Sequence, residues 1–331
     1  MKQTEMQKVS INRRTAVGAL AIGATLAAFP TMAQEFPKKQ PIKIIVGFNA
    51  GGLTDVLARI TAEFLQRRLG QAVVVENRPG ASAAIAVDFV AKSPPDGYTL
   101  YMSAPELAVL TAVRRNLDFK SEDFTYLIRP FVTPPLILAT AKLPVSSPTE
   151  LIAYMKANPG RVRYGTPGVG HLNHLGTALF EGAAGVKGVH IPYTGAAPIY
   201  TDLAGGNVDI YIGGTPPFPE TIKVLGPVGS TRHPGYPNLQ TLEELGLKNA
   251  SHDAWFGLVA PPNLPKPIAD RLIAELGALY KDPEAIAKFQ SASKIVPEKN
   301  PLTGEAFKMQ VLGENKAWKT VVDREKIVVQ Q

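Results

Sequence analysis

The sequence predicts an α/β protein, and its first strands and helices, at 42–114, predict a parallel sheet with helices on both faces. Short runs rich in β-branched residues alternate with segments whose apolar residues recur at helical spacing, and turns rich in Gly and Pro separate them. An apolar content of 45% with 19% charged residues is typical of an ordinary globular protein. A chain of 331 residues is long enough for two lobes, which we expect in preference to one large core.

The first unit covers residues 42–70. An apolar run at Ile42–Val46 suits a buried strand, a loop with three glycines follows at 47–52, and a helix capped by Thr54 or Asp55 ends at a glycine. A glycine loop that leads into a helix leaves backbone N–H groups free to bind an anion such as a carboxylate. A plain turn without a ligand fits the same residues equally well, so both interpretations stay open from this stretch alone.

The same alternation continues to the end of the chain. Further strands are expected at 72–76, 98–102, 136–139, 162–164, 189–193, 208–212, 222–228 and 255–260. Helices are expected at 83–92, 105–114, 148–158, from 172 onward, and at 198–203, 265–280, 283–290 and 301–323.

The N-terminus has the pattern of an export signal. Lys2, Lys8 and a twin-arginine pair precede an apolar stretch at 16–29 that is too short to span a bilayer, and a small-residue cleavage site ends at Ala33. We expect cleavage near Ala33, a periplasmic location and a mature net charge of +4 in place of +7. Export by the Sec or by the twin-arginine route stays open, and a single-span anchor is disfavoured.

Composition excludes several classes of function. The chain has no Cys, and therefore no disulfide, thiol nucleophile or Cys–metal site. No basic stripe suited to nucleic acid is present, and neither is a P-loop, an HExxH or a GxSxG motif. We expect no cofactor, no catalytic residue and no enzymatic activity, because no nucleophile–base set occurs.

A second glycine loop follows the strand at 162–164. Its sequence, YGTPGVGHLNHL, lacks the third glycine of a dinucleotide fingerprint, and His171 with His174 lack a further ligand for a metal site. His174 suits a packed or capping role, and His171 either meets a ligand or faces solvent. Two such loops on two lobes would hold a carboxylate between opposed helix starts.

Three other polar residues allow two readings each. Asp55 is expected to cap its helix and Asp209 to bind nearby backbone amides, rather than to act as an acid–base pair. Tyr193 is either a core residue at a turn or an aromatic side chain on the rim of the cleft.

The motifs IVGFNAGGLTD, VVVENRPGA, PPDGYTL, ANPGRVRYGTPGVGHLNHL and IPYTGAAPIYTDLAGGNVD together resemble one family. In their order and spacing, the chain is similar to the substrate-binding proteins of tripartite tricarboxylate transporters, the Bug (Bordetella uptake gene) family. The resemblance implies a type II periplasmic-binding-protein fold, with two α/β lobes joined by two crossover strands around a ligand cleft. It places lobe 1 at 34–137 plus 258–331 and lobe 2 at 138–257.

The resemblance also implies a function. The protein would capture a small carboxylate, either a dicarboxylate or an aromatic acid, by cleft closure and deliver it to the permease subunits of such a transporter. A ligand-presenting sensor with a signalling partner is the alternative, and a periplasmic enzyme is a remote one. We expect a monomer, no metal and no nucleic-acid partner.

Carried over by position, the resemblance implies a set of ligand contacts, which are Phe48, Asn49, Gly52, Thr54, Asp55, Ser103, Ala104, Thr166, Gly168, Gly170, His171, Tyr193 and Asp209. The sequence departs from the family where Gly47 and Ala50 replace prolines, where Ser82-Ala83 replaces paired glycines, and where His171 stands for a common Ser. We interpret these departures as a shifted ligand preference, with His171 at the distal end of the ligand.

Overall fold

The computed structural model describes residues 36–327, apart from residues 115 and 215. The chain divides into two units, Met1–Phe36 and Pro37–Gln331, and the second holds every element named below. Within the described residues, no helix is both long and apolar enough to cross a membrane. The predicted export signal and the cleavage site expected near Ala33 lie outside the described residues.

The first sheet contains six strands, in the order β11 (Leu302–Thr303), β4 (Thr125–Thr133), β10 (Ala254–Ala260), β3 (Thr99–Ser103), β1 (Ile42–Val46) and β2 (Val73–Asn77). β1, β2 and β3 run parallel, whereas β10 runs antiparallel to both β3 and β4. The parallel sheet predicted from the strands and helices at 42–114 is confirmed by β1–β3, and the expected return strand is β10, which inserts antiparallel between β3 and β4.

Helices surround this sheet and come from both ends of the chain. They are α2 (Leu53–Leu69), α3 (Ala84–Ala91), α4 (Glu106–Val113), α8 (Lys266–Leu276), α9 (Pro283–Ser293) and α10 (Gly304–Arg324), with short 3₁₀ turns η1 (Ala81–Ala83), η2 (Ser121–Asp123) and η3 (Leu279–Lys281). α10 packs on α4 and β4, and α9 packs on α2.

The second sheet contains five strands, in the order β7 (Val189–Pro192), β6 (Arg163–Thr166), β8 (Ile210–Gly213), β5 (Leu136–Thr140) and β9 (Ile222–Pro227). β6 pairs parallel with β7 and β8, whereas β5 is antiparallel to β8 and β9. The helices of this lobe are α5 (Pro148–Ala157), α6 (Leu172–Ala184) and α7 (Ala196–Gly205).

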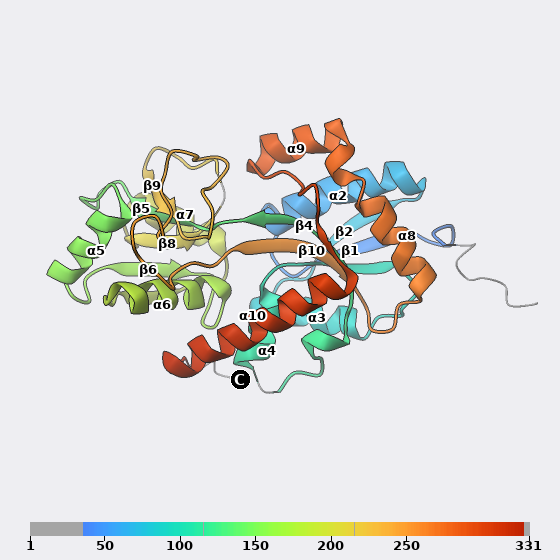
Figure 1. Cartoon of the computed structure of the whole chain (residues 1–331), viewed down its shortest axis with the longest axis horizontal. Coiled ribbons are helices and arrows are strands. Elements are labelled where there is room, and N and C mark those ends of the chain that lie inside the picture. The colour runs from blue at the N-terminus through green and yellow to red at the C-terminus, as the bar shows by residue number, and fades with distance from the viewer. Residues whose placement is uncertain (1–35, 115, 215, 328–331) are drawn as a thin grey trace, which may run out of the picture. The chain divides into compact units, whose positions relative to one another are not determined.

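The chain passes between the two sheets twice. It leaves the first sheet at the end of β4, turns through Pro134 and Pro135, and enters the second sheet as β5; it returns through β10. Figure 1 shows β4 and β10 side by side on the path between the sheets, as their antiparallel pairing requires. The lobe boundaries expected at 137/138 and 257/258 fall inside β5 and β10, and they stay a prediction.

Buried side chains form a large cluster around the first sheet and smaller clusters in the second lobe. The first cluster includes Tyr101, Leu107 and Trp255 and also Leu172 and Leu175 from the start of α6. The second-lobe helix that follows the second glycine loop therefore packs against the first lobe.

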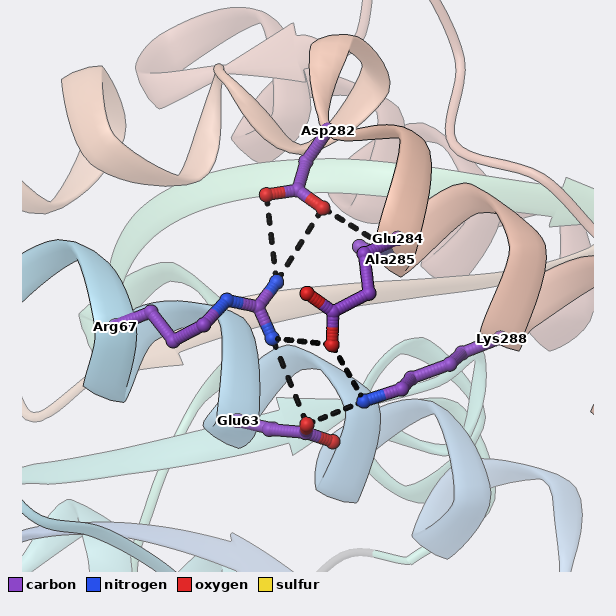
Figure 2. A network of polar contacts seen from close by, with 6 residues as sticks. All are labelled: Glu63, Arg67, Asp282, Glu284, Ala285 and Lys288. Carbon is purple, nitrogen blue, oxygen red and sulfur yellow. Dashed lines mark hydrogen bonds and ion pairs between the residues drawn. The ribbon is translucent and has the colours of Figure 1, made fainter.

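An ion-pair network joins α2 to α9 on the surface of the first lobe (Figure 2). Arg67 places Nη2 at 3.3 Å from Asp282 and Nη1 at 3.2 Å from Glu284. Lys288 contacts both Glu63 of α2 and Glu284 of α9, so acidic and basic side chains alternate along the contact between the two helices. This network fastens the first glycine-loop helix to an element more than 200 residues away in sequence.

Candidate functional site

The first glycine loop connects β1 to α2. Gly51 has φ +85°, a left-handed conformation that glycine adopts without steric cost. Gly52 is the N-cap residue of α2, and no side chain caps this helix start. The free N–H groups of the first turn, together with the positive end of the helix dipole, suit an anion.

Asp55 holds this loop in place from within α2. Its carboxylate is 2% exposed and accepts hydrogen bonds from the Gly51 N–H, from Arg59 Nε and from Asn77 Nδ2, each at 2.9 Å. Asn77 Nδ2 also donates to the Phe48 carbonyl oxygen at 3.0 Å, which ties the end of β2 to the loop. The carboxylate of Asp55 is thus fully engaged by the protein itself.

These contacts correct the predicted helix cap. The cap position belongs to Gly52. Asp55 instead accepts a hydrogen bond from the Gly51 N–H, and Thr54 is buried in α2. Burial alone would raise the pKa of Asp55, but the hydrogen bonds from Arg59, Gly51 and Asn77 outweigh burial and hold the pKa below its usual value. Asp55 therefore stays ionised and keeps the loop closed around the helix start.

The second glycine loop connects β6 to α6. Gly168 and Gly170 have φ +140° and +74°, and the Thr166 hydroxyl donates to the Gly168 carbonyl oxygen at 3.1 Å. His171 is the N-cap residue of α6, as its position at the loop–helix junction predicts, and its Nδ1 accepts from the Asn173 N–H at 3.2 Å. Burial lowers the pKa of His171 to about 4, so the ring is neutral near pH 7.

Two further histidines, His174 and His190, contact residues of this loop through their ring nitrogens. His174 Nδ1 accepts from the Gly170 N–H at 3.1 Å, and His190 Nε2 lies 2.6 Å from the Thr166 hydroxyl. The two imidazole rings stack with centroids 4.0 Å apart. Burial lowers the pKa of His174 to about 4 and also lowers that of His190, so both rings remain neutral acceptors or donors. The packed role predicted for His174 matches this arrangement.

The two glycine loops face each other. The rings of Phe48 and His171 meet edge to face with centroids 6.0 Å apart. A Cβ built on Gly195 would lie 3.5 Å from Asn49 Nδ2, and one built on Gly168 would lie 3.6 Å from Ser82 Oγ. Side chains of the first lobe thus reach the backbone of the second lobe at this junction.

Ser103 is the last residue of β3 and Ala104 follows it, and both are buried. Tyr193 follows the end of β7, and its N–H donates to the Thr166 carbonyl oxygen at 2.8 Å. Its hydroxyl, however, donates to Asp202 of α7 at 2.6 Å. Tyr193 therefore joins the second loop through its backbone, while its hydroxyl is committed to a neighbouring helix.

The structure places Asp209 apart from the other residues of the predicted set. Asp209 precedes β8, at the amino end of the parallel strands, whereas both glycine loops follow carboxyl ends. Its carboxylate accepts from the Arg163 N–H at 2.7 Å and pairs with the Arg163 guanidinium at 2.8 Å. The expected bond to a backbone amide is present, and a ligand contact is not supported by this position.

Sequence reasoning missed two features of the first lobe. Ala81, Ser82 and Ala83 have φ of +51°, +55° and +76°, although non-glycine residues lose roughly 1–2 kcal/mol each in this region. A Cβ on Gly47 would overlap the Ala83 side chain, which explains why a proline does not fit at position 47. The second feature is Glu106, an acid buried at the start of α4. Its place one residue after Pro105 at a helix start was the available signal.

No group of three or more His, Asp or Glu within the described residues is placed to hold a metal ion. The arrangement instead offers backbone N–H donors from two lobes, with neutral histidines and aromatic rings around them.

Comparison with known proteins agrees with this architecture. Residues 57–307 match the model of the tripartite tricarboxylate transporter family receptor. BugT of Bordetella pertussis is 37% identical over 261 residues, which cover 76% of this chain and 80% of BugT. The periplasmic binding protein BugD shares 29% identity at a TM-score of 0.80, over 88% of this chain and 99% of BugD.

The R. palustris protein Rpa4515, solved with adipate, shares 30% identity at a TM-score of 0.81, over 88% of this chain and 99% of that chain. These likenesses confirm the two-lobed type II periplasmic-binding-protein fold that the sequence motifs imply. The chain belongs to the tripartite tricarboxylate transporter receptor family, a family of periplasmic solute-binding proteins.

Proposed function

We propose that this protein captures a small carboxylate between its two glycine loops and delivers it to the permease subunits of a tripartite tricarboxylate transporter. The observation that carries the proposal is the meeting of the two loops, each at a helix start, with Phe48 and His171 in contact. Gly52 with the first turn of α2 on one lobe, and the second loop with the start of α6 on the other, would donate backbone hydrogen bonds to the same carboxylate. The N–H groups of Gly51 and Gly170 are already bonded to Asp55 and His174, so these two glycines shape the loops.

Cleft closure is the physical basis of capture. A ligand that bonds to both loops favours the closed state only, because the open state offers one loop at a time. Neutral His171 and the Phe48 ring would then cover the rest of the ligand, which suits an aliphatic or aromatic body. The related R. palustris protein was solved with adipate, which supports a carboxylate as the ligand class.

Location and export follow from the same proposal. Cleavage of the signal near Ala33 would release the mature protein into the periplasm, where the family operates. The proposal includes no chemical step, because the two loops contribute backbone donors and neutral rings rather than a nucleophile with its base.

A thermal-shift screen of the mature protein, unfolded and refolded to remove carried ligand, tests this function. The panel contains adipate, hexanoate, citrate, benzoate, terephthalate and nicotinate. A ligand at a hundred times its Kd adds about 2.7 kcal/mol to the free energy of unfolding, which raises Tm by about 4 °C for a domain of this size. If none of these acids raises Tm, the proposal is contradicted.

A matched pair of glycine variants locates the binding site. Gly170→Ala and Gly160→Ala both introduce a side chain at positive φ, at +74° and +67°, so both carry the strain of a left-handed backbone. Gly170 is buried and Gly160 exposed, so the Tm of each variant is measured beside its Kd. Only Gly170 lies in the second loop, whereas Gly160 lies in the turn between α5 and β6. We expect Gly170→Ala to weaken carboxylate binding at least tenfold and Gly160→Ala to leave it unchanged. Equal effects would place the site elsewhere.

A further inference from the structure

Glu106, the first residue of α4, is an acid buried beside the first loop. Its side chain is 4% exposed, and Oε1 accepts hydrogen bonds from the Tyr101 hydroxyl at 2.6 Å and from the Ala104 N–H at 3.0 Å. In the part of the chain that the structure describes, Oε2 has no hydrogen-bond partner. A buried carboxyl oxygen without a partner is costly, so this group calls for an explanation.

The position of Glu106 connects it to the proposed binding site. Ala104 follows the end of β3, which pairs with β1, the strand that leads into the first loop. A Cβ built on Gly47 of that loop would lie 3.0 Å from the Tyr101 hydroxyl, which in turn donates to Glu106. The carboxyl group therefore lies beside the first loop, where the ligand is proposed to bind.

The end of β3 and the start of α4 form an anion-binding position that the carboxyl group of Glu106 already occupies. The Ala104 N–H and the start of α4 form a place where a ligand carboxylate would be stabilised. Glu106 supplies a carboxyl group from the chain itself and uses that N–H. A second carboxylate brought close would meet a like charge in a buried setting, or would have to hold a proton, and both are unfavourable.

We propose that Glu106 is a specificity-determining residue that fills the anion position at the end of β3, so that the protein selects ligands with a single carboxylate. The proposal rests on the proposed function and narrows it: a monocarboxylate binds with its carboxylate at the glycine loops and an uncharged end toward β3. Dicarboxylates of the same carbon skeleton bind more weakly.

The protonation of Glu106 makes this selection depend on pH. Burial raises the pKa of Glu106 to about 7, against the lowering effect of the bonds from Tyr101 and Ala104. Tyr101 on β3 is the titratable group in contact with it, and burial raises the pKa of that phenol well above its usual range. Asp55 on α2 is bonded to Arg59, and Glu314 on α10 is bonded to the Trp255 indole. η2 also packs on α4, and its two acids, Glu122 and Asp123, are exposed. The 3₁₀ turn at 81–83 carries no titratable side chain.

Matched ligand pairs test the inference. Hexanoate is compared with adipate, and benzoate with terephthalate, by isothermal titration calorimetry at pH 6 and pH 8. The proteins are the wild type, Glu106→Gln, which keeps an acceptor for Tyr101 and Ala104 without a charge, and Glu122→Gln as a control. Glu122 lies exposed on η2 of the same lobe, so this variant removes one solvated negative charge and leaves the buried carboxyl group in place.

In the wild type we expect the monocarboxylate of each pair to bind more tightly. Between pH 6 and pH 8 the Kd of the dicarboxylate should rise about tenfold, because an acid with this pKa passes from roughly 90% to roughly 10% protonated over that range. The Kd of the monocarboxylate should change far less. Glu106→Gln should remove the pH dependence and reduce the preference at pH 8 about tenfold, and Glu122→Gln should behave as the wild type.

The outcomes separate this inference from the function on which it rests. Tighter binding of dicarboxylates by the wild type, or the same preference in Glu106→Gln, would overturn the inference and leave carboxylate binding intact. Failure of the wild type to bind any of the four acids would overturn both. If Glu106→Gln does not fold, the wild-type measurements at two pH values still decide, because a dicarboxylate Kd that does not rise with pH contradicts the role of Glu106.

Discussion

Replacing Asp55 by Asn should loosen the first glycine loop and destabilise the protein. The amide keeps one acceptor oxygen, but its NH₂ group faces a donor, either the Gly51 N–H or Asn77 Nδ2, both of which lie 2.9 Å from the present carboxylate. One buried donor then loses its partner, which costs about 1–3 kcal/mol. The Arg59 side chain is 52% exposed, so its lost ion pair adds at most about 0.5 kcal/mol.

The expected loss is therefore about 2–3 kcal/mol in the free energy of unfolding. For a chain of about 300 residues this lowers Tm by about 3–5 °C. Because the pKa of Asp55 is lowered in the folded protein, its stabilising effect is present above the unfolded pKa of about 3.9 and is lost as the pH falls through the folded value. The Tm difference between wild type and variant should be constant above about pH 5 and should shrink toward pH 3.

Asp88→Asn is the matched control, measured by the same differential scanning calorimetry. Asp88 also pairs with a cation four residues later, Lys92 at 2.8 Å, but its side chain is 38% exposed. Exposed pairs of this kind contribute about 0.3–0.5 kcal/mol. If Asp55→Asn costs no more than Asp88→Asn, the buried hydrogen bonds do not hold the loop, and the reasoning is refuted.

Three other predictions concern packing and charge. Gly176→Ala would push a Cβ into the buried His252 ring, so we expect a loss of about 1–3 kcal/mol by calorimetry, whereas Gly313→Ala in α10, with nothing within 4 Å, should stabilise slightly. Burial lowers the pKa of all five histidines, so Tm should fall as the pH drops from 6.5 toward 4, because the unfolded chain binds more protons there; a flat profile would contradict this. Arg67→Ala in the network of Figure 2 should cost at most about 1 kcal/mol and less still in high salt, and a larger loss would show that these exposed pairs act cooperatively.

Local sequence patterns predicted the positions of most helices and strands well. The glycine loops, the turn at Pro134–Pro135 and the prolines at helix starts all have local physical signals, and the structure places elements beside each of them. The parallel order of β1–β3 follows from local patterns, but the place of β10 between β3 and β4 does not, because β10 comes from more than a hundred residues away in the chain. Nothing in the sequence of β10 itself encodes its direction.

The site residues divide in the same way. Phe48 and His171 follow strands at carboxyl ends, and topology alone brings such residues together. Asp209 was expected inside a strand at 208–212, but β8 begins at Ile210, which leaves Asp209 at the opposite edge beside Arg163.

Glu106 and the left-handed run at 81–83 depend on contacts through space. α4, which begins at Glu106, is covered by α10, and Ala83 lies against Gly47 at a distance that leaves no room for a side chain there. No local propensity predicts either one, because Ala and Ser ordinarily avoid positive φ. The left-handed run lies where this sequence departs from the family pattern, at Ser82-Ala83, which makes it a place to seek the protein's own ligand preference.

The most direct test of the account is an amide spectrum of the mature protein labelled with ¹⁵N-glycine, recorded with and without the tightest carboxylate of the panel. Glycine→Ala variants assign the signals of Gly51, Gly52, Gly168 and Gly170. The account predicts that the signals of glycine amides from both loops shift at once, because one carboxylate would contact both lobes, and that the proton of Gly52 moves downfield as its N–H donates to the ligand. If the ligand binds and shifts only other glycines, or those of a single loop, the carboxylate is not held between the two loops.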